Sequence, residues 1–156
     1  MNPDRLTVKA GEALNEAVAL ARKAGNPVVQ DTHLFLALLS QDESIVVPVL
    51  QKLGASVTSL REQAERALAR FPKQSGAQPA PSRELNQVFD RAEEEARKLG
   101  DEYVSTEHLL LALAAVKSTE TQPILKGVGA TYDALLSALE AVRGSHRVTD
   151  QTPENQ

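Results

Sequence analysis

Histidines and carboxylates are the side chains of this chain that could carry acid–base or metal chemistry, because cysteine is absent. His33 and His108 lie 75 residues apart, each just before a run of apolar residues. Two such histidines could meet at a metal ion, but no His or Glu stands four residues from either one to complete a local ligand pattern. We therefore expect both to be hydrogen-bonded packing histidines and expect no metal site.

Carboxylates are concentrated between Phe89 and Glu107, a stretch that contains seven acidic and three basic residues. A run of this kind usually forms a solvated helix face, although its excess negative charge could attract a basic partner and would be screened by salt. Glu107 stands just inside an expected helix start, where its simplest role is to offset the positive end of that helix.

No motif for nucleotide chemistry or nucleophilic catalysis is present. The pattern G-x-x-x-x-G-K-[ST] has no match, and neither has G-x-G-x-x-G. No Ser, His and Asp arrangement can be assembled from the sequence. We expect a domain without a catalytic site and without a bound cofactor.

The elements that must position these residues occur twice. Asn26–Leu38 reads NPVVQDTHLFLAL and Asp101–Leu113 reads DEYVSTEHLLLAL, and the match continues without a gap over about residues 10–68. Such a long self-match indicates a structural repeat. Gly25 and Gly100 each follow a helical stripe of apolar residues and suit a helix end.

A central helix is expected in each copy, at about Thr32–Ser40 and Leu109–Ala115. Each is apolar nearly all round and must therefore be buried, with Leu36 and Leu111 at equivalent places. Asp31 and Thr106 are the expected caps of these helices, and Thr7 is the expected cap of the first helix. The predicted fold is all-α, with about eight helices in two four-helix repeats related by a pseudo-twofold axis.

Proline and glycine divide the chain. The stretch 71–82, FPKQSGAQPAPS, cannot hold a helix and predicts a linker between repeat one (about 6–70) and repeat two (about 83–143). Residues 144–156 are polar, which predicts a flexible tail after a domain spanning 1–143.

Charge and composition limit the partners and the compartment. A net charge of −4 and a pI near 5.4 argue against non-specific nucleic-acid binding. No apolar run reaches the roughly 18 residues of a membrane span. The lack of a secretory signal and of cysteine favours a cytoplasmic protein.

Three segments carry a family resemblance: Arg5-Leu6-Thr7, Ala96–Leu113 and Phe71–Gly76. They resemble the amino-terminal domain of Clp-family AAA+ chaperones, above all that of ClpB-type protein disaggregases. The resemblance covers about residues 3–143, and the tail resembles the beginning of a linker to an ATPase module.

The resemblance implies a domain, monomeric by itself, that engages unfolded or aggregated polypeptide and passes it to a homohexameric ring. ATP and Mg²⁺ would belong to the ATPase modules of that ring, which would work with a DnaK-type chaperone. The residues implied in substrate handling are Thr7, Asp101 and Glu107. We expect the carboxylates of Asp101 and Glu107 to be exposed and to favour basic segments. The alternative is an adaptor-docking domain of a Clp unfoldase that works with a protease.

Two departures from family patterns concern binding sites. Some members line a peptide groove with leucines, where this chain has Arg91, Glu95 and His108, so an apolar groove is not expected there. A phosphorylated-arginine site in the relative ClpC uses a glutamate at the start of both central helices. This chain has Glu107 in one copy and Thr32 in the other, so a paired site is not expected.

Overall fold

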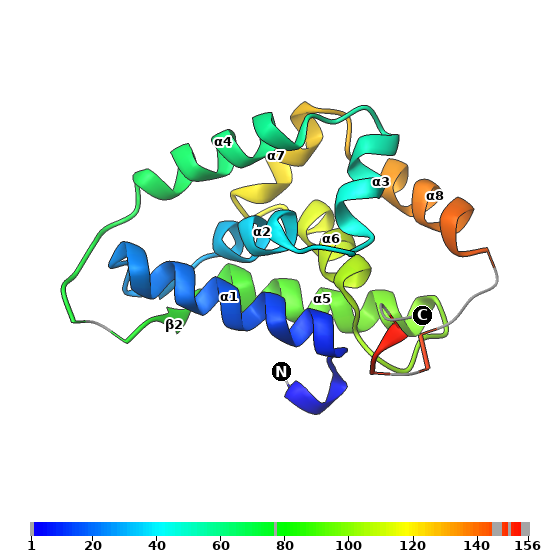
Figure 1. Ribbon diagram of the computed structural model, residues 1–156, viewed down its shortest axis with the longest axis horizontal. Helices are drawn as coiled ribbons and strands as arrows, with labels where there is room; N and C mark the ends of the chain where they lie inside the picture. Colours follow the sequence, from blue (N-terminus) through cyan, green and yellow to red (C-terminus); the bar gives the residue numbers. More distant parts are fainter. Residues whose placement is uncertain (1, 77, 145–147, 150, 154–156) are drawn as a thin grey trace.

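Eight α-helices form the part of the domain that the structure describes, as predicted (Figure 1). A computed structural model describes residues 2–76, 78–144, 148–149 and 151–153. A short 3-10 helix, η1 (Pro3–Arg5), precedes the eight α-helices. The helices are α1 (Val8–Ala24), α2 (Asp31–Ser40), α3 (Val46–Lys52), α4 (Val57–Ala69), α5 (Arg83–Lys98), α6 (Thr106–Ala115), α7 (Thr121–Gly127) and α8 (Tyr132–Arg143).

The packing of the helices repeats between the two halves. The bounds of α2 and α6, and those of α3 and α7, differ by the 75 residues of the sequence repeat. α1 packs on α2 as α5 packs on α6, while α3 contacts α8 and α7 contacts α4. Such reciprocal contacts are those of a twofold relation, so the predicted pseudo-twofold arrangement is present.

The central helices are buried as predicted. Every residue of α2 from Asp31 to Leu39, and every residue of α6 from Thr106 to Ala114, is buried. The two helices contact each other and join the halves into one core. Leu111 is fully enclosed, whereas Leu36 keeps 8% of its surface exposed. This difference marks a groove in the first half.

The caps of the central helices lie one residue earlier than predicted. Gln30 and Ser105 are the N-caps, and each exchanges a reciprocal pair of hydrogen bonds with the histidine three residues later. Asp31 instead forms hydrogen bonds to the second half. Its carboxylate accepts the N–H of Thr121 at 2.9 Å and the Thr121 hydroxyl at 2.6 Å. Asp31 therefore stabilises the start of α7 in the other half.

A two-residue parallel strand pair, which the sequence analysis did not predict, joins the linker to the first half. β1 (Val28–Val29) pairs with β2 (Ala80–Pro81). Its counterpart in the second half is a single bridge between Leu6 and Val104. In both halves, the extended residues before the central helix leave backbone groups that need partners. The segment that leads into the first helix of the other half supplies them.

The linker is held at both ends, and Ser75, Gly76 and Gln78 between them are exposed. Gln74 donates its N–H to the Gly25 carbonyl at 2.7 Å, and Ala80 donates to the Pro27 carbonyl at 3.1 Å. We expect limited proteolysis to cut first between Gln74 and Ala80 or in the tail, because a protease needs accessible backbone. Mass spectrometry of the first fragments would check this. An earlier cut within α6 would contradict the layout.

Part of the predicted tail lies against the domain. Val148 is buried, accepts the N–H of Glu102 at 2.8 Å and donates its own N–H to Asp101 at 2.7 Å. The Gln151 carbonyl accepts the N–H of Val8 at 2.7 Å. Residues 145–147, 150 and 154–156 of the tail lie outside the described residues. None of the helices among the described residues combines the length and the apolar character that a membrane span requires.

Candidate functional site

The three residues implied in substrate handling gather at one place. Thr7 caps α1 by accepting the N–H of Ala10 at 3.2 Å, and its own N–H donates to the Val104 carbonyl at 2.9 Å. Val104 lies in the loop between Asp101, which follows α5, and Glu107, in the first turn of α6. The Leu6–Val104 bridge therefore brings the start of α1 to the loop between the two acids.

The two carboxylates are buried, so the expectation that they are exposed is wrong. Asp101 is 6% exposed and Glu107 is 7% exposed. Arg143, in the last turn of α8, donates to the two Asp101 oxygens at 2.6 and 2.8 Å and lies 3.3 Å from a Glu107 oxygen. The sequence analysis missed Arg143. The repeat offered a signal for it. Arg143 aligns with Leu68 of repeat one, so a charged residue stands where the other half has an apolar one.

Asp101 is held in its charged form. Burial would raise its pKa, but hydrogen bonds from His108 and Arg143, together with the Val148 N–H, outweigh burial and hold the pKa well below the ordinary value. Glu107 in addition accepts the Ser105 hydroxyl at 2.7 Å. The carboxylates thus act first by fixing the loop, α6 and α8 relative to one another.

His33 and His108 occupy equivalent hydrogen-bonded positions, as expected for packing histidines. The Nδ1 atoms accept the N–H of Gln30 at 2.9 Å and of Ser105 at 2.8 Å, respectively. The Nε2 of His33 lies 3.0 Å from the Asn26 amide oxygen, and that of His108 lies 2.7 Å from the Asp101 carboxylate. One histidine therefore faces a neutral partner, and the other faces an anion.

The neutral partner leaves His33 without an anion to stabilise a proton, and burial lowers its pKa to about 4 from 6.5. Between these values the unfolded chain binds a proton that the folded protein does not, so stability falls as the pH drops. We expect the lowered pKa of His33 to reduce the free energy of unfolding by up to about 3 kcal/mol as the pH falls from 6.5 to 4. Urea denaturation of the wild type and of His33→Gln across this range would measure the difference.

Asn26→Asp provides the control for this pH effect, because it gives His33 the partner that His108 already has. We expect its His33 pKa, followed by NMR titration of the imidazole, to rise above 4. Asp31, whose pKa burial raises, changes stability with the opposite sign, so the variants must be compared at each pH. A wild-type His33 that titrates near 6.5 would contradict the expectation.

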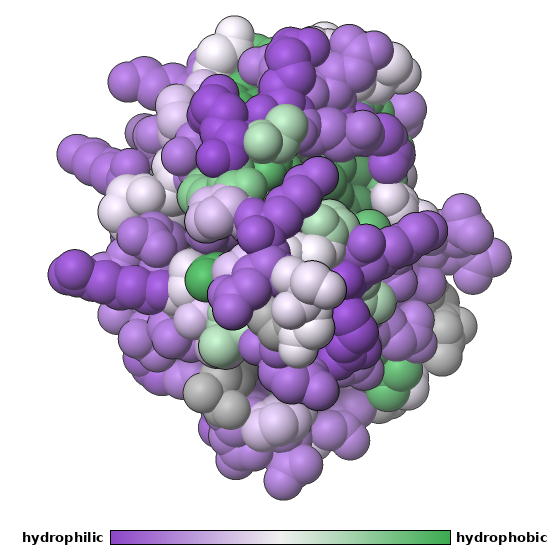
Figure 2. Space-filling model, turned by 90° about the vertical axis from the view of Figure 1, so that its left-hand side faces the viewer, coloured by the Kyte–Doolittle hydropathy of each residue, from purple (hydrophilic) through white to green (hydrophobic). Residues whose placement is uncertain are grey.

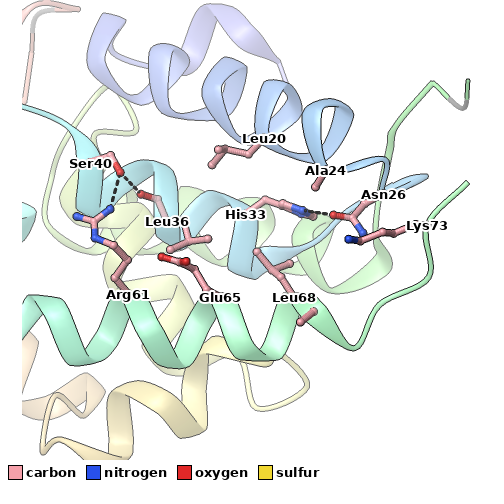
Figure 3. Close-up of a pocket in the computed structure, with 11 residues that line it drawn as sticks. Leu20, Ala24, Asn26, His33, Leu36, Ser40, Arg61, Glu65, Leu68 and Lys73 are labelled. Atoms are coloured by element: carbon pink, nitrogen blue, oxygen red, sulfur yellow. Dashed lines mark hydrogen bonds between the residues drawn. The ribbon is translucent and has the colours of Figure 1, made fainter. Parts of the chain in front are cut away.

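A second candidate site is a groove of about 400 Å³ in the first half, between α1, α2 and α4 (Figure 3). Its apolar lining is Leu20, Ala24, Leu36, Leu68 and Ala69. Arg61 lies at one end, where it donates to the Ser40 hydroxyl at 3.0 Å and to the Leu39 carbonyl at 3.3 Å. Lys73 and Asn26 lie at the opposite end in the figure.

The leucine-lined groove of some relatives has no apolar counterpart at Arg91, Glu95 and His108. Glu95 is fully buried and accepts from Tyr132 at 2.5 Å, Arg91 at 2.7 Å and Lys98 at 3.3 Å. Burial would raise the pKa of Glu95, but these hydrogen bonds hold it below the ordinary value. The Arg91 guanidinium also lies 5.2 Å from the centre of the Tyr132 ring. A polar cluster therefore fills this place.

Metal binding has no evident site among the described residues. No group of three or more His, Asp or Glu side chains there could hold a metal ion. The buried acids Asp31, Glu95 and Asp101 instead pair with helix N–H groups, hydroxyls or bases.

Comparisons with known proteins agree with this architecture. The model of the Clp repeat (R) N-terminal domain matches residues 5–128. The chaperone protein ClpB of Corynebacterium glutamicum is 42% identical over 153 residues, which are 96% of this chain and 18% of the relative. ClpB of Porphyromonas gingivalis is 36% identical over 156 residues, again 18% of its length. The chain thus spans less than a fifth of these relatives.

Solved structures share the fold at lower identity. The Hsp104 N-terminal domain from Candida albicans is 23% identical with a TM-score of 0.82, covering 94% of this chain and 97% of that domain. A ClpV N-domain in complex with a VipB peptide is 21% identical with a TM-score of 0.70, covering 90% and 88%. The family model, the ClpB relatives and the eight-helix repeat together show that the chain belongs to the Clp repeat N-terminal domain family.

Proposed function

We propose that this chain is the substrate-engaging N-terminal domain of an ATP-dependent ClpB-type chaperone that remodels misfolded proteins. The observation that carries the proposal is identity of about 40% to ClpB chaperones over nearly the whole chain. The domain would bind unfolded or aggregated polypeptide and present it to the rest of the protein. ATP hydrolysis with Mg²⁺, a hexameric ring and work with a DnaK-type chaperone in the cytoplasm belong to this proposal for the parent protein.

The binding surface that we propose is built around Thr7, Asp101 and Glu107. The support is geometric, because the start of α1 and the loop before α6 meet there, held by Arg143. Val8 adds apolar surface beside Thr7, since it is 49% exposed. The ClpV N-domain solved with a VipB peptide indicates that this fold can seat a peptide.

Binding through this surface is expected to be weak and to respond to loss of the two carboxylates. The matched change is Asp101→Asn with Glu107→Gln, which keeps side-chain shape. An asparagine amide can partner the histidine at this place, because Asn26 pairs with His33 in the equivalent position. Because this change removes two negative charges from the surface, affinity for a basic unfolded protein should fall about two- to fivefold.

The measurement is a titration of a permanently unfolded protein, with its cysteines blocked, against wild type and variant. Circular dichroism would verify that the variant is folded. Asp90→Asn with Glu94→Gln removes the same charge from exposed sites on α5 and is expected to leave affinity within twofold. Equal affinity in all three proteins would place the site elsewhere. Binding of folded adaptors but not of unfolded chains would favour the adaptor-docking alternative.

A further inference from the structure

The two halves differ at one equivalent place, which is filled in the second half and open in the first. In the second half, the buried side chains of Arg143 and Glu95 occupy it, with 7% and 1% of their surfaces exposed. The positions 75 residues earlier are Leu68 and Leu20, and both line the groove between α1, α2 and α4. Shorter, uncharged side chains therefore leave in the first half the space that an ion-paired network fills in the second.

The apolar part of this groove favours a large apolar side chain. Leu20 and Leu68 are half-buried, and Leu36 faces the groove from a helix that is otherwise enclosed. Covering such surfaces is favourable in proportion to the apolar area removed from water. A groove of about 400 Å³ lies at the lower end of ligand-site volumes, so it fits a side chain of an extended segment better than a whole helix.

The charge at the Lys73 end selects among such segments. Residues 18–25 and 63–74, which end α1 and α4 and begin the linker, contain five bases and one acid in a chain of net charge −4. The charged residues that line the groove itself are Arg61, Glu65 and Lys73, which leaves an excess of one positive charge. Figure 2 views the molecule from this side, where hydrophilic side chains surround smaller hydrophobic areas. Bases at helix ends offset the helix dipole, but Lys73 lies outside any helix and lines the groove itself.

We propose that the groove between α1, α2 and α4 binds an extended polypeptide segment in which a large apolar side chain is flanked by acidic residues. The inference rests on the proposed function only in that the ligand is a polypeptide, and it uses a different face from the Thr7 surface. The apolar side chain enters beside Leu36 and Leu68, and an acidic neighbour meets Lys73.

The probe is a ten-residue peptide of glycine and serine with a central tryptophan flanked by glutamates. The chain itself contains no tryptophan, so peptide fluorescence reports binding directly. A second peptide carries lysines in place of the glutamates. We expect the glutamate peptide to bind at least about tenfold more tightly. Equal binding of the two peptides, or preference for the lysine peptide, would overturn the charge assignment.

Closing the groove tests the site itself. Asn26→Asp with Leu68→Arg copies the pair that fills the second half, and it should weaken peptide binding at least about tenfold. Ala19→Arg adds an arginine alone, at an exposed position of α1 outside the groove, and should leave affinity within about twofold. Unchanged affinity in the closed variant, folded by circular dichroism, would overturn the proposal.

A second variant does not depend on repacking the groove. Lys73→Glu changes an exposed residue and should reverse the preference between the two peptides, whereas Lys52→Glu, on α3, should not. Asp101→Asn with Glu107→Gln should leave peptide binding unchanged, which separates this groove from the surface of the proposed function. Loss of peptide binding in that variant, with Lys73→Glu unaffected, would assign the peptide to the Thr7 surface instead.

Discussion

Replacement of Asp101 by alanine is expected to lower the free energy of unfolding by about 3–5 kcal/mol, because it removes the carboxylate that receives two hydrogen bonds from a buried base. The carboxylate receives two hydrogen bonds from Arg143 and one from the Val148 N–H, and it contacts the His108 ring. Alanine would remove these four contacts, and Arg143, with a side chain only 7% exposed, would keep the Glu107 carboxylate at 3.3 Å as a charged partner.

Urea denaturation at pH 7 measures the effect, and Asn26→Ala is the matched control. Asn26 holds the equivalent place but contacts His33 and the Pro72 carbonyl without an ion pair, so its loss should cost less, about 1–3 kcal/mol. Equal losses of unfolding free energy in the two variants would show that the Asp101–Arg143 ion pair adds nothing to stability. Because the folded pKa of Asp101 is depressed, its contribution is present above the ordinary value of 3.8 and is lost as the pH falls below it.

Leu111→Ala is expected to lower the free energy of unfolding by about 2–5 kcal/mol, and Leu36→Ala is expected to cost less. Both residues stand at the same place of the repeat, on the two central helices. Leu111 is fully enclosed, so its truncation leaves a cavity. Leu36 borders an open groove that water already reaches, so its truncation mainly enlarges that groove.

Chemical denaturation of both variants beside the wild type measures this difference. The midpoint of Leu111→Ala should fall further than that of Leu36→Ala, with similar m-values if the unfolded states are alike. An unchanged midpoint for Leu111→Ala would contradict the central position of α6. Equal losses at both positions would contradict the open groove beside Leu36.

The two buried acids have a consequence for how binding variants are chosen. Alanine at Asp101 combines a loss of charge with a loss of stability, so a weaker interaction could report partial unfolding. Asparagine and glutamine keep the side-chain shape but replace one accepting oxygen by a donating NH2, so the stability of the variant must be measured beside its affinity. The same reasoning makes Lys73, which is exposed, a cleaner position than Leu68 for testing the groove.

The architecture was predictable because it depends on local patterns. Helical spacing of apolar residues, glycine at the helix ends and a threonine cap at Thr7 each act within a few residues of one another. The repeat then required two similar halves, and the nearly all-apolar segments containing Leu36 and Leu111 had to lie inside. His33 and His108 were correctly interpreted as packing residues for the same reason, since their partners come from the adjacent loops.

The state of the candidate sites was decided by contacts between residues far apart in the chain. The sequence analysis expected Asp101 and Glu107 to be exposed because Arg143, their common partner, lies 42 residues beyond Asp101 in a helix whose direction local patterns do not set. The strand pair formed because the linker returns to Val28–Val29, and the groove stayed open because Leu68 cannot make the ion pairs of Arg143. Identical local rules shape both halves, and long-range charge pairing makes them different.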